Sequence, residues 1–128
     1  MTYNPRFLMT LAGRNRMKDP DWTFFSNYAH VLVCLAENPS ARLREVADRV
    51  GITERSAQRL ITHLDEAGIL TRVKHGRRNS YYIDTTAHLR HPIEEQSTVG
   101  ELLKIILSPA RVRRLEAKKA AFDEQRAD

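Results

Sequence analysis

The sequence feature that most constrains the fold is a pair of short amphipathic segments separated by a glycine turn. In the first segment, apolar residues stand at Leu43, Val46, Ala47 and Val50. This three-four spacing places the four side chains on one face of a helix. Gly51 follows, and a glycine at that position is typical of a helix end. A helix with this pattern must bury its apolar face against a neighbouring element.

The second segment starts at Thr53, a residue type that favours helix N-termini, and runs to Gly68. Its apolar positions repeat the same spacing, at Ala57, Leu60, Ile61 and Leu64. The pattern predicts two helices joined by a turn of about three residues. Ala47 is small enough to let the second helix pack closely against the first. This is the pattern of a helix-turn-helix.

A β-hairpin with a basic tip is predicted directly after the second helix. Residues 69–75 and 80–84 are rich in alternating and β-branched residues, and residues 76–79 between them are predicted to form the loop. The predicted fold class is therefore mainly α with a small β-hairpin wing, a winged helix-turn-helix, with extra N- and C-terminal helical segments.

Three stretches of the chain are expected to differ in their roles. Residues 1–22 carry basic residues but too few apolar ones for a core, which predicts a basic N-terminal arm. Residues 23–92 are predicted to form the winged helix-turn-helix domain, opening with a helix over residues 23–37 that is buried on several sides. Residues 93–128 are predicted to form two further helices.

A homodimer is expected, with an interface built by the arm, the helix over residues 23–37 and the C-terminal helices. The reason is a surplus of apolar residues beyond the needs of one small core; they are Leu102, Leu103, Ile106 and Leu107. A dimer of this kind places two recognition helices on one side of DNA, with half-sites about 10 bp apart in a roughly palindromic operator.

Residues 43–55 and 64–70 resemble winged-helix transcriptional regulators of the MarR and ArsR type. Residues 76–81, 90–92 and 98–103 are more similar still to a group of short actinobacterial regulators. The resemblance spans roughly residues 24–107. It implies binding of double-stranded DNA as a dimer, and it implies no particular effector.

The second helix is predicted to present a DNA-reading face opposite its apolar one. The exposed positions of that face are Thr53, Arg55, Ser56, Gln58, Arg59, Thr62 and His63. Arg makes paired hydrogen bonds to guanine, Gln does so to adenine, and Ser bonds bases or phosphates. The base-reading candidates are Arg55, Ser56, Gln58 and Arg59. Glu54 is left out, because its carboxylate repels phosphate.

The predicted wing supplies a second set of candidates, which are Lys74, Arg77, Arg78 and Asn79. No acid stands between positions 74 and 78, so this tip can follow the phosphate backbone. Arg78 is the candidate for insertion into a narrow minor groove. The alternative is a charged turn that keeps the edge of a hairpin soluble.

Composition narrows the class of protein. The chain has 21 Lys or Arg against 16 Asp or Glu, a net charge of +5 that suits a polyanion but also many ordinary proteins. The longest apolar run has six residues, from 31 to 36, against the ~20 needed to span a membrane. One cysteine and no signal-peptide pattern favour the cytoplasm. No phosphate loop or nucleophile motif is present, so an enzyme is not expected.

Two pairs of residues have the spacing of metal ligands, and each has another interpretation. His30 and Cys34 lie four apart, as metal ligands or a thiol sensor would, but two ligands do not make a site, and Cys34 stands in an apolar run. His88 and His91 precede Pro92, which favours a loop. We expect no metal and no cofactor.

Two other functions remain open at this stage. A winged helix can also be a protein-interaction module without sequence-specific DNA binding, its basic face meeting an acidic protein. RNA binding is weakly supported, since Tyr81 and Tyr82 alone do not make a stacking sheet. A small-molecule effector is left open, because the sequence names no ligand.

Overall fold

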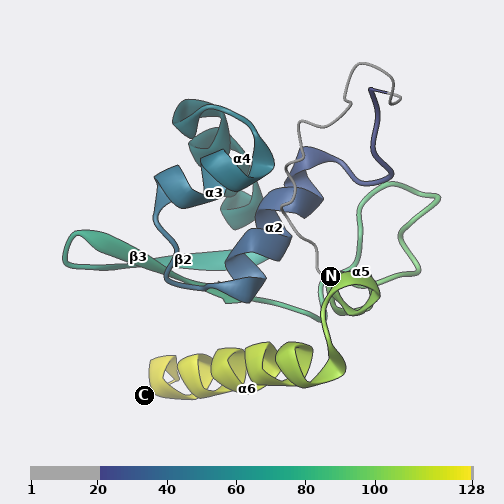
Figure 1. Cartoon of the computed structure of the whole chain (residues 1–128). Helices are drawn as coiled ribbons and strands as arrows, with labels where there is room; N and C mark the ends of the chain where they lie inside the picture. The colour runs from purple at the N-terminus through teal and green to yellow at the C-terminus, as the bar shows by residue number, and fades with distance from the viewer. Residues whose placement is uncertain (1–20, 128) are drawn as a thin grey trace.

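The computed structural model describes residues 21–127 and consists of five helices around one β-hairpin in that range (Figure 1). The elements in order are α2 (Asn27–Glu37), α3 (Leu43–Val50), α4 (Glu54–Glu66), β2 (Leu70–His75), β3 (Arg78–Ile83), α5 (Val99–Ile106) and α6 (Pro109–Arg126). Helices α2, α3 and α4 lie on one side of the hairpin, and α6 lies on the other (Figure 1). The predicted winged helix-turn-helix fold is confirmed.

The turn between α3 and α4 is as short as the sequence predicts. Gly51 adopts the left-handed conformation, with φ of 87°, which L side chains rarely take. The backbone N–H groups of Gly51 and Ile52 both donate to the carbonyl of Ala47, at 2.8 and 3.0 Å. Thr53 then caps α4, because its hydroxyl accepts a hydrogen bond from the Ser56 backbone N–H at 3.0 Å. The local sequence alone fixes where one helix stops and the next begins.

The hairpin has a shorter loop than the sequence analysis assigned. Strands β2 and β3 pair antiparallel from Leu70 with Ile83 to His75 with Arg78, so only Gly76 and Arg77 remain in the loop. Gly76 has φ of 63°, as two-residue hairpin loops require. The prediction of a loop over residues 76–79 was therefore wrong for its last two residues, which continue the strand.

The first described helix starts later than predicted, at Asn27 rather than at residue 23. The hydroxyl of Thr23 donates to the Phe25 carbonyl at 2.6 Å, a local bond of non-helical backbone. Phe24 is 90% exposed, so the prediction that this part of the segment is buried was wrong. From Ala29 onward, α2 is buried on several sides, as predicted.

The C-terminal helices pack on the same core as the winged helix. Leu103 and Leu107, with Val112 and Leu115 of α6, belong to the one cluster of buried side chains that also holds α2, α4 and the hairpin. The argument that the leucines near residue 103 are surplus to one core was therefore wrong for Leu103 and Leu107, which this chain buries itself.

Helix α6 runs along the hairpin and is fixed to it by side-chain contacts. The rings of Phe122 and Tyr82 stack with centroids 4.0 Å apart and an interplanar angle of 9°. At the other end of α6, the Arg111 guanidinium donates to the Glu37 carbonyl at 2.9 Å. Thr85 reaches α6 as well, since its hydroxyl donates to the Glu116 carboxylate at 3.2 Å. The underside of the wing is thus covered by this chain's own helix.

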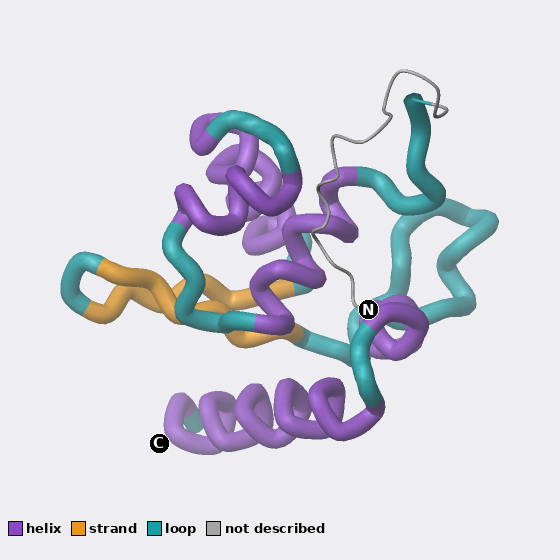
Figure 2. Tube along the Cα trace, in the orientation of Figure 1, coloured by secondary structure: helices purple, strands orange, loops and turns teal. Residues whose placement is uncertain are grey.

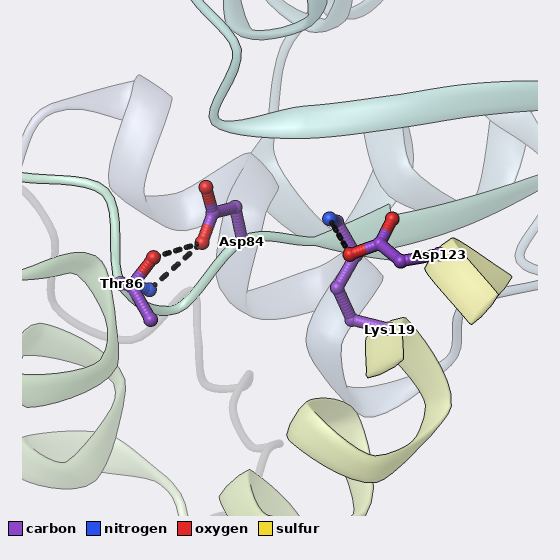
Figure 3. Close-up of polar contacts among 4 residues, drawn as sticks. All are labelled: Asp84, Thr86, Lys119 and Asp123. Carbon is purple, nitrogen blue, oxygen red and sulfur yellow. Dashed lines mark hydrogen bonds and ion pairs between the residues drawn. The ribbon is translucent and has the colours of Figure 1, made fainter. Parts of the chain in front are cut away.

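A sharp turn after β3 leads the chain away from the hairpin (Figure 3). The Asp84 carboxylate accepts hydrogen bonds from the Thr86 backbone N–H at 2.9 Å and from its hydroxyl at 2.6 Å. On α6, the Lys119 ammonium pairs with the Asp123 carboxylate at 2.7 Å, a contact between successive helical turns. The first pair of bonds orders the turn after β3, and the ion pair stabilises α6.

The remaining expectations concern residues inside and outside the described range. Cys34 is buried, and this burial raises the pKa of its thiol, which fits a small core residue. His88 and His91 lie in the loop, as expected. No helix within residues 21–127 combines the length and the apolar character that crossing a membrane requires. The predicted basic arm covers residues 1–22. Of these, only Asp21 and Trp22 belong to the described part of the chain.

Candidate nucleic-acid interface

A groove of about 670 Å³ lies between the start of α3, the N-terminal half of α4 and the hairpin. We call it the basic groove. Its lining comprises Ala41, Arg42, Leu43, Arg44, Glu45, Glu54, Gln58, Ile61, Arg72, Arg77, Arg78, Asn79 and Tyr81. Five of these thirteen residues are arginines and two are glutamates, so the groove attracts a polyanion.

Glu54 is the acid closest to the DNA-reading candidates, and the structure gives it a partner. Its carboxylate lies 3.5 Å from the Arg44 guanidinium, and both side chains are more than half exposed. Glu54 also stands in the first turn of α4, where the helix dipole favours a negative charge. Its repulsion toward phosphate is therefore partly offset by Arg44.

Helix α4 presents three long polar side chains on its outer face, Arg55, Gln58 and Arg59. All three residues are exposed. Within residues 21–127 neither arginine forms an ion pair or a side-chain hydrogen bond. Their guanidinium groups are available to an external acceptor.

The two hydroxyl candidates at the start of α4 are occupied with each other. The Thr53 hydroxyl donates to the Ser56 hydroxyl at 3.0 Å while it accepts from the Ser56 backbone. Thr53 is exposed and Ser56 is half-buried. This pair shapes the helix N-terminus, where backbone N–H groups point outward and bind anions.

The wing candidates separate into two groups. Lys74 and Arg77 are exposed at the free end of the hairpin. Arg78 instead turns back, and its guanidinium donates to the Ser40 carbonyl at 2.9 Å. The Asn79 amide donates to the Tyr81 hydroxyl at 3.4 Å. Arg78 therefore adjoins the two-residue loop, with its guanidinium already bonded within this chain.

The last two candidates on α4 do not line the basic groove. Thr62 is half-buried and its hydroxyl accepts from Arg72 of β2 at 3.4 Å. His63 points to the other side, where its Nδ1 is 2.7 Å from the Tyr28 hydroxyl and the two rings stack. The side of α4 that carries His63 faces away from the groove because the helix rotates by about 100° per residue.

The sequence analysis missed three groove arginines, namely Arg42, Arg44 and Arg72. Arg42 and Arg44 stand at the start of α3, and Arg72 is on β2, where it also lies 3.5 Å from Asp65. The only sequence signal was the excess of basic residues from 41 to 80, nine Lys or Arg against five Asp or Glu. That excess does not show which arginines converge, because the fold brings α3 and the hairpin together.

One family model matches part of this architecture. The model of the IclR helix-turn-helix domain matches residues 27–74, from the start of α2 into β2. No curated protein matches the chain in sequence.

Among solved structures, three similar proteins illustrate the likeness, all at low identity. The PcaV transcriptional regulator of Streptomyces coelicolor, in complex with its natural ligand, has 22% identity and a TM-score of 0.44, covering 96% of this chain and 81% of that one. ZitR of Lactococcus lactis in complex with DNA has 14% identity and a TM-score of 0.45, covering 94% of this chain and 77% of that one. A MarR family protein of Mycobacterium tuberculosis in complex with salicylic acid has 19% identity and a TM-score of 0.42, covering 80% of this chain and 71% of that one. We transfer no residue role from these proteins.

Proposed function

Because the chain carries a winged helix-turn-helix DNA-binding domain of the kind found in transcriptional regulators, we propose that it binds double-stranded DNA sequence-specifically as a dimeric regulator. The observation that carries this proposal is the basic groove, in which α4 and the hairpin meet with five arginines around Gln58. A solvated protein surface has no need of five arginines converging in one groove. A phosphate backbone does attract such a cluster.

Helix α4 is the reading element in this proposal. The major groove of B-DNA, about 12 Å wide, admits an α-helix. Arg55 and Arg59 then reach guanine edges and Gln58 reaches an adenine edge, while the capped N-terminus of α4 meets a phosphate. Base readout rests on these three side chains, because the Ser56 hydroxyl already accepts a hydrogen bond from the Thr53 hydroxyl.

The hairpin supplies backbone contacts. Lys74 and Arg77 are exposed near the end of the hairpin and follow the phosphates, and Arg77, in the loop, takes the minor-groove position that the sequence analysis gave to Arg78. Arg78 acts as a positioning residue, since its bond to the Ser40 carbonyl ties the wing to the loop before α3. The wing is thereby held at a fixed distance from α4.

Selection of bound sequences from a random pool of duplex DNA tests the proposal. We expect one palindromic site with half-sites centred about 10 bp apart, which is the signature of a symmetric dimer. Gln58→Ala should relax the preference at one position of each half-site by ~1–3 kcal/mol. A pool with no enriched sequence would instead favour the protein-interaction module, since that module needs no DNA preference.

The salt dependence of binding tests the wing separately. Removing one phosphate contact lowers the slope of log K against log salt by about 1. We expect this reduction in Arg77→Ala. The matched control is Arg113→Ala, which removes the same charge from the exposed surface of α6, on the other side of the hairpin. Equal slopes in the two variants would contradict the assignment of Arg77.

The proposed location in the cell follows from the proposed binding to DNA. A regulator of this type works where chromosomal DNA is accessible, and we propose the cytoplasm. We propose no effector and no sign of regulation.

A further inference from the structure

A second surface lies beyond the other end of α4. Here the segment before α2, the loop between β3 and α5, and α5 itself surround an apolar hollow of about 950 Å³. Figure 2 shows this loop and the segment before α2 as the long teal stretches on the side away from the hairpin tip. We call the surface the apolar face and define it by Trp22, Phe24, Tyr28, Ile93 and Ile105.

The apolar face leaves large hydrophobic side chains in water. Phe24 is 90% exposed, Ile93 is 88% exposed and Ile105 is 71% exposed. Of the six exposed large hydrophobic residues in the described part of the chain, five belong to this face. Scattered apolar residues on a surface are ordinary, but a contiguous group around a hollow marks a contact site.

The exposed side chains stand on the rim of the hollow. The ring of Trp22 packs edge-on against Phe24, with centroids 5.1 Å apart, so the two aromatic rings form one projecting unit. Phe24 and Ile93 line the hollow and are 90% and 88% exposed, whereas Trp22, 62% exposed, lies outside its lining. A protein surface laid across the rim covers them together.

The charges on this face are of both signs. Arg90 and the carboxylates of Glu94 and Glu101 border the hollow. Glu101 caps its own helix by accepting from the Thr98 backbone N–H at 2.8 Å. Within residues 21–127 neither Arg90 nor Glu94 forms an ion pair. A two-fold interface places each residue against its counterpart, so a face that carries both signs can satisfy itself.

We propose that the apolar face is the dimer interface, docking on the same face of a second copy of this chain. Arg90 of each copy meets Glu94 of the other, and the aromatic and isoleucine side chains fill the centre. The inference rests on the proposed function, which calls for a dimer, and it names the surface that the sequence analysis had spread over three segments.

The size of the face fits a stable association. A standard interface buries ~800 Å² per partner, and one aromatic side chain contributes roughly 150–250 Å². Two aromatics with Ile93 and Ile105 therefore supply much of the required area. Helix α6 is not needed, because its apolar residues Val112 and Leu115 are already in the core of this chain.

The two surfaces are linked through a single rigid helix. Gln58 lies in the basic groove and His63 lines the apolar face, five residues or ~7.5 Å further along the axis of α4. In the dimer the C-terminal halves of both α4 helices approach the two-fold axis. Both basic grooves remain open to DNA.

Sedimentation equilibrium of the full chain without DNA tests the proposal. We expect a dimer for the wild type at tens of micromolar, and an association at least about 100-fold weaker for Phe24→Ser and for Ile105→Asp, since each substitution removes two central contacts in a symmetric dimer. Both positions are exposed, so circular dichroism should show unchanged folding. Ala117→Asp is the matched control, because it adds the same charge to the exposed surface of α6.

A charge exchange tests the two-fold pairing itself. Arg90→Glu alone and Glu94→Arg alone should each weaken the dimer, because like charges then meet twice. A mixture of the two variants should restore association as a heterodimer, in which every pair is again of opposite sign. A mixture that associates no better than its components would overturn the proposed register.

The outcomes separate this inference from the proposed function. A wild-type monomer at tens of micromolar overturns the interface and leaves the face to another occupant, such as residues 1–20 of this chain or a small apolar ligand. Unchanged dimerisation in Phe24→Ser together with dissociation of Ala117→Asp overturns it in favour of α6. A dimer that enriches no DNA sequence contradicts the proposed function while the interface stands.

Discussion

The basic groove and the apolar face are two surfaces of one small domain, and they differ in how well water solvates their side chains. The side chains of the groove are solvated as they stand, and several are fixed by bonds within the chain, such as Arg78 to the Ser40 carbonyl. The face exposes Phe24 and Ile105, which have no polar group to solvate. The groove is therefore stable in water without a partner. The apolar side chains of the face are unfavourable in water, and covering them lowers the free energy.

This difference indicates that the two surfaces support two different kinds of association. Charged groups on rigid elements give a surface that binds DNA reversibly and in proportion to ionic strength. Apolar groups give an association that depends little on salt. Both surfaces depend on the same buried core, so variants should separate three effects, on the core, on the groove and on the face.

The largest expected effect is on the core that supports both surfaces. Leu35 of α2 is fully buried, and α2 packs against α3, α4 and α6. Leu35→Ala should lower the free energy of unfolding by ~2–5 kcal/mol, through lost burial and a residual cavity. Urea denaturation at low protein concentration measures this loss.

Ile105→Ala is the control for that experiment, since it removes a similar volume from a side chain that is 71% exposed. At concentrations where the chain is monomeric, its stability should stay within about 0.5 kcal/mol of the wild type. A large loss here would mean that Ile105 already packs within the monomer, and the contrast between core and face would fail.

The next effect separates two neighbouring turns of α4. Arg59→Ala should relax the preference for one base pair by ~1–3 kcal/mol, because its guanidinium is free to bind a base edge. His63→Ala should leave sequence preference unchanged, since the His63 imidazole is already bonded to the Tyr28 hydroxyl of α2. Competition binding with single-base operator variants measures both. Altered base preference in His63→Ala would return that residue to the DNA-reading set.

A smaller effect compares the helix caps of the two regions. Thr53 caps α4 beside the groove, and Thr98 caps α5 beside the face, each hydroxyl accepting a backbone N–H three residues later. Thr53→Ala and Thr98→Ala should each reduce stability by ~1 kcal/mol. Thermal unfolding measures the loss, and serine at either position should recover most of it. No loss in one variant would show that its helix is held by packing alone.

The smallest effect is a pH dependence in the helix that supports both regions. Burial lowers the pKa of His30 below its usual value of 6.5. The unfolded chain therefore takes up this proton at a higher pH than the folded chain does. Stability should fall as the pH drops through 6.5 and level off below the folded value. Unfolding of His30→Gln should lack this component, and identical pH profiles for both proteins would contradict it.

Sequence reasoning was most reliable where the cause of a structure is local. Thr53 accepts from a backbone group three residues away, and Gly51 adopts a conformation that its own lack of a Cβ allows. These causes lie within one turn of chain, so the sequence predicted α3, α4 and the turn between them. The burial of Cys34 followed in the same way from its apolar neighbours.

Sequence reasoning did not reveal contacts that join distant parts of the chain. Arg78 is next to the loop of the wing, but its guanidinium is bonded to the Ser40 carbonyl, 38 residues away in sequence. His63 had the right spacing for a DNA-reading face, but its position is set by Tyr28 of α2. Phe24 was assigned to a buried helix that in fact begins three residues after it.

The sequence by itself determined the order of the elements, the helix caps, the apolar faces and the excess of basic charge near the wing. Each of these follows from short-range hydrogen bonding or from periodicity. Only the tertiary structure decided which arginines meet in the basic groove and which hydrophobic residues remain exposed after the core is filled. Convergence and residual exposure are properties of packing between elements, and no single segment contains them.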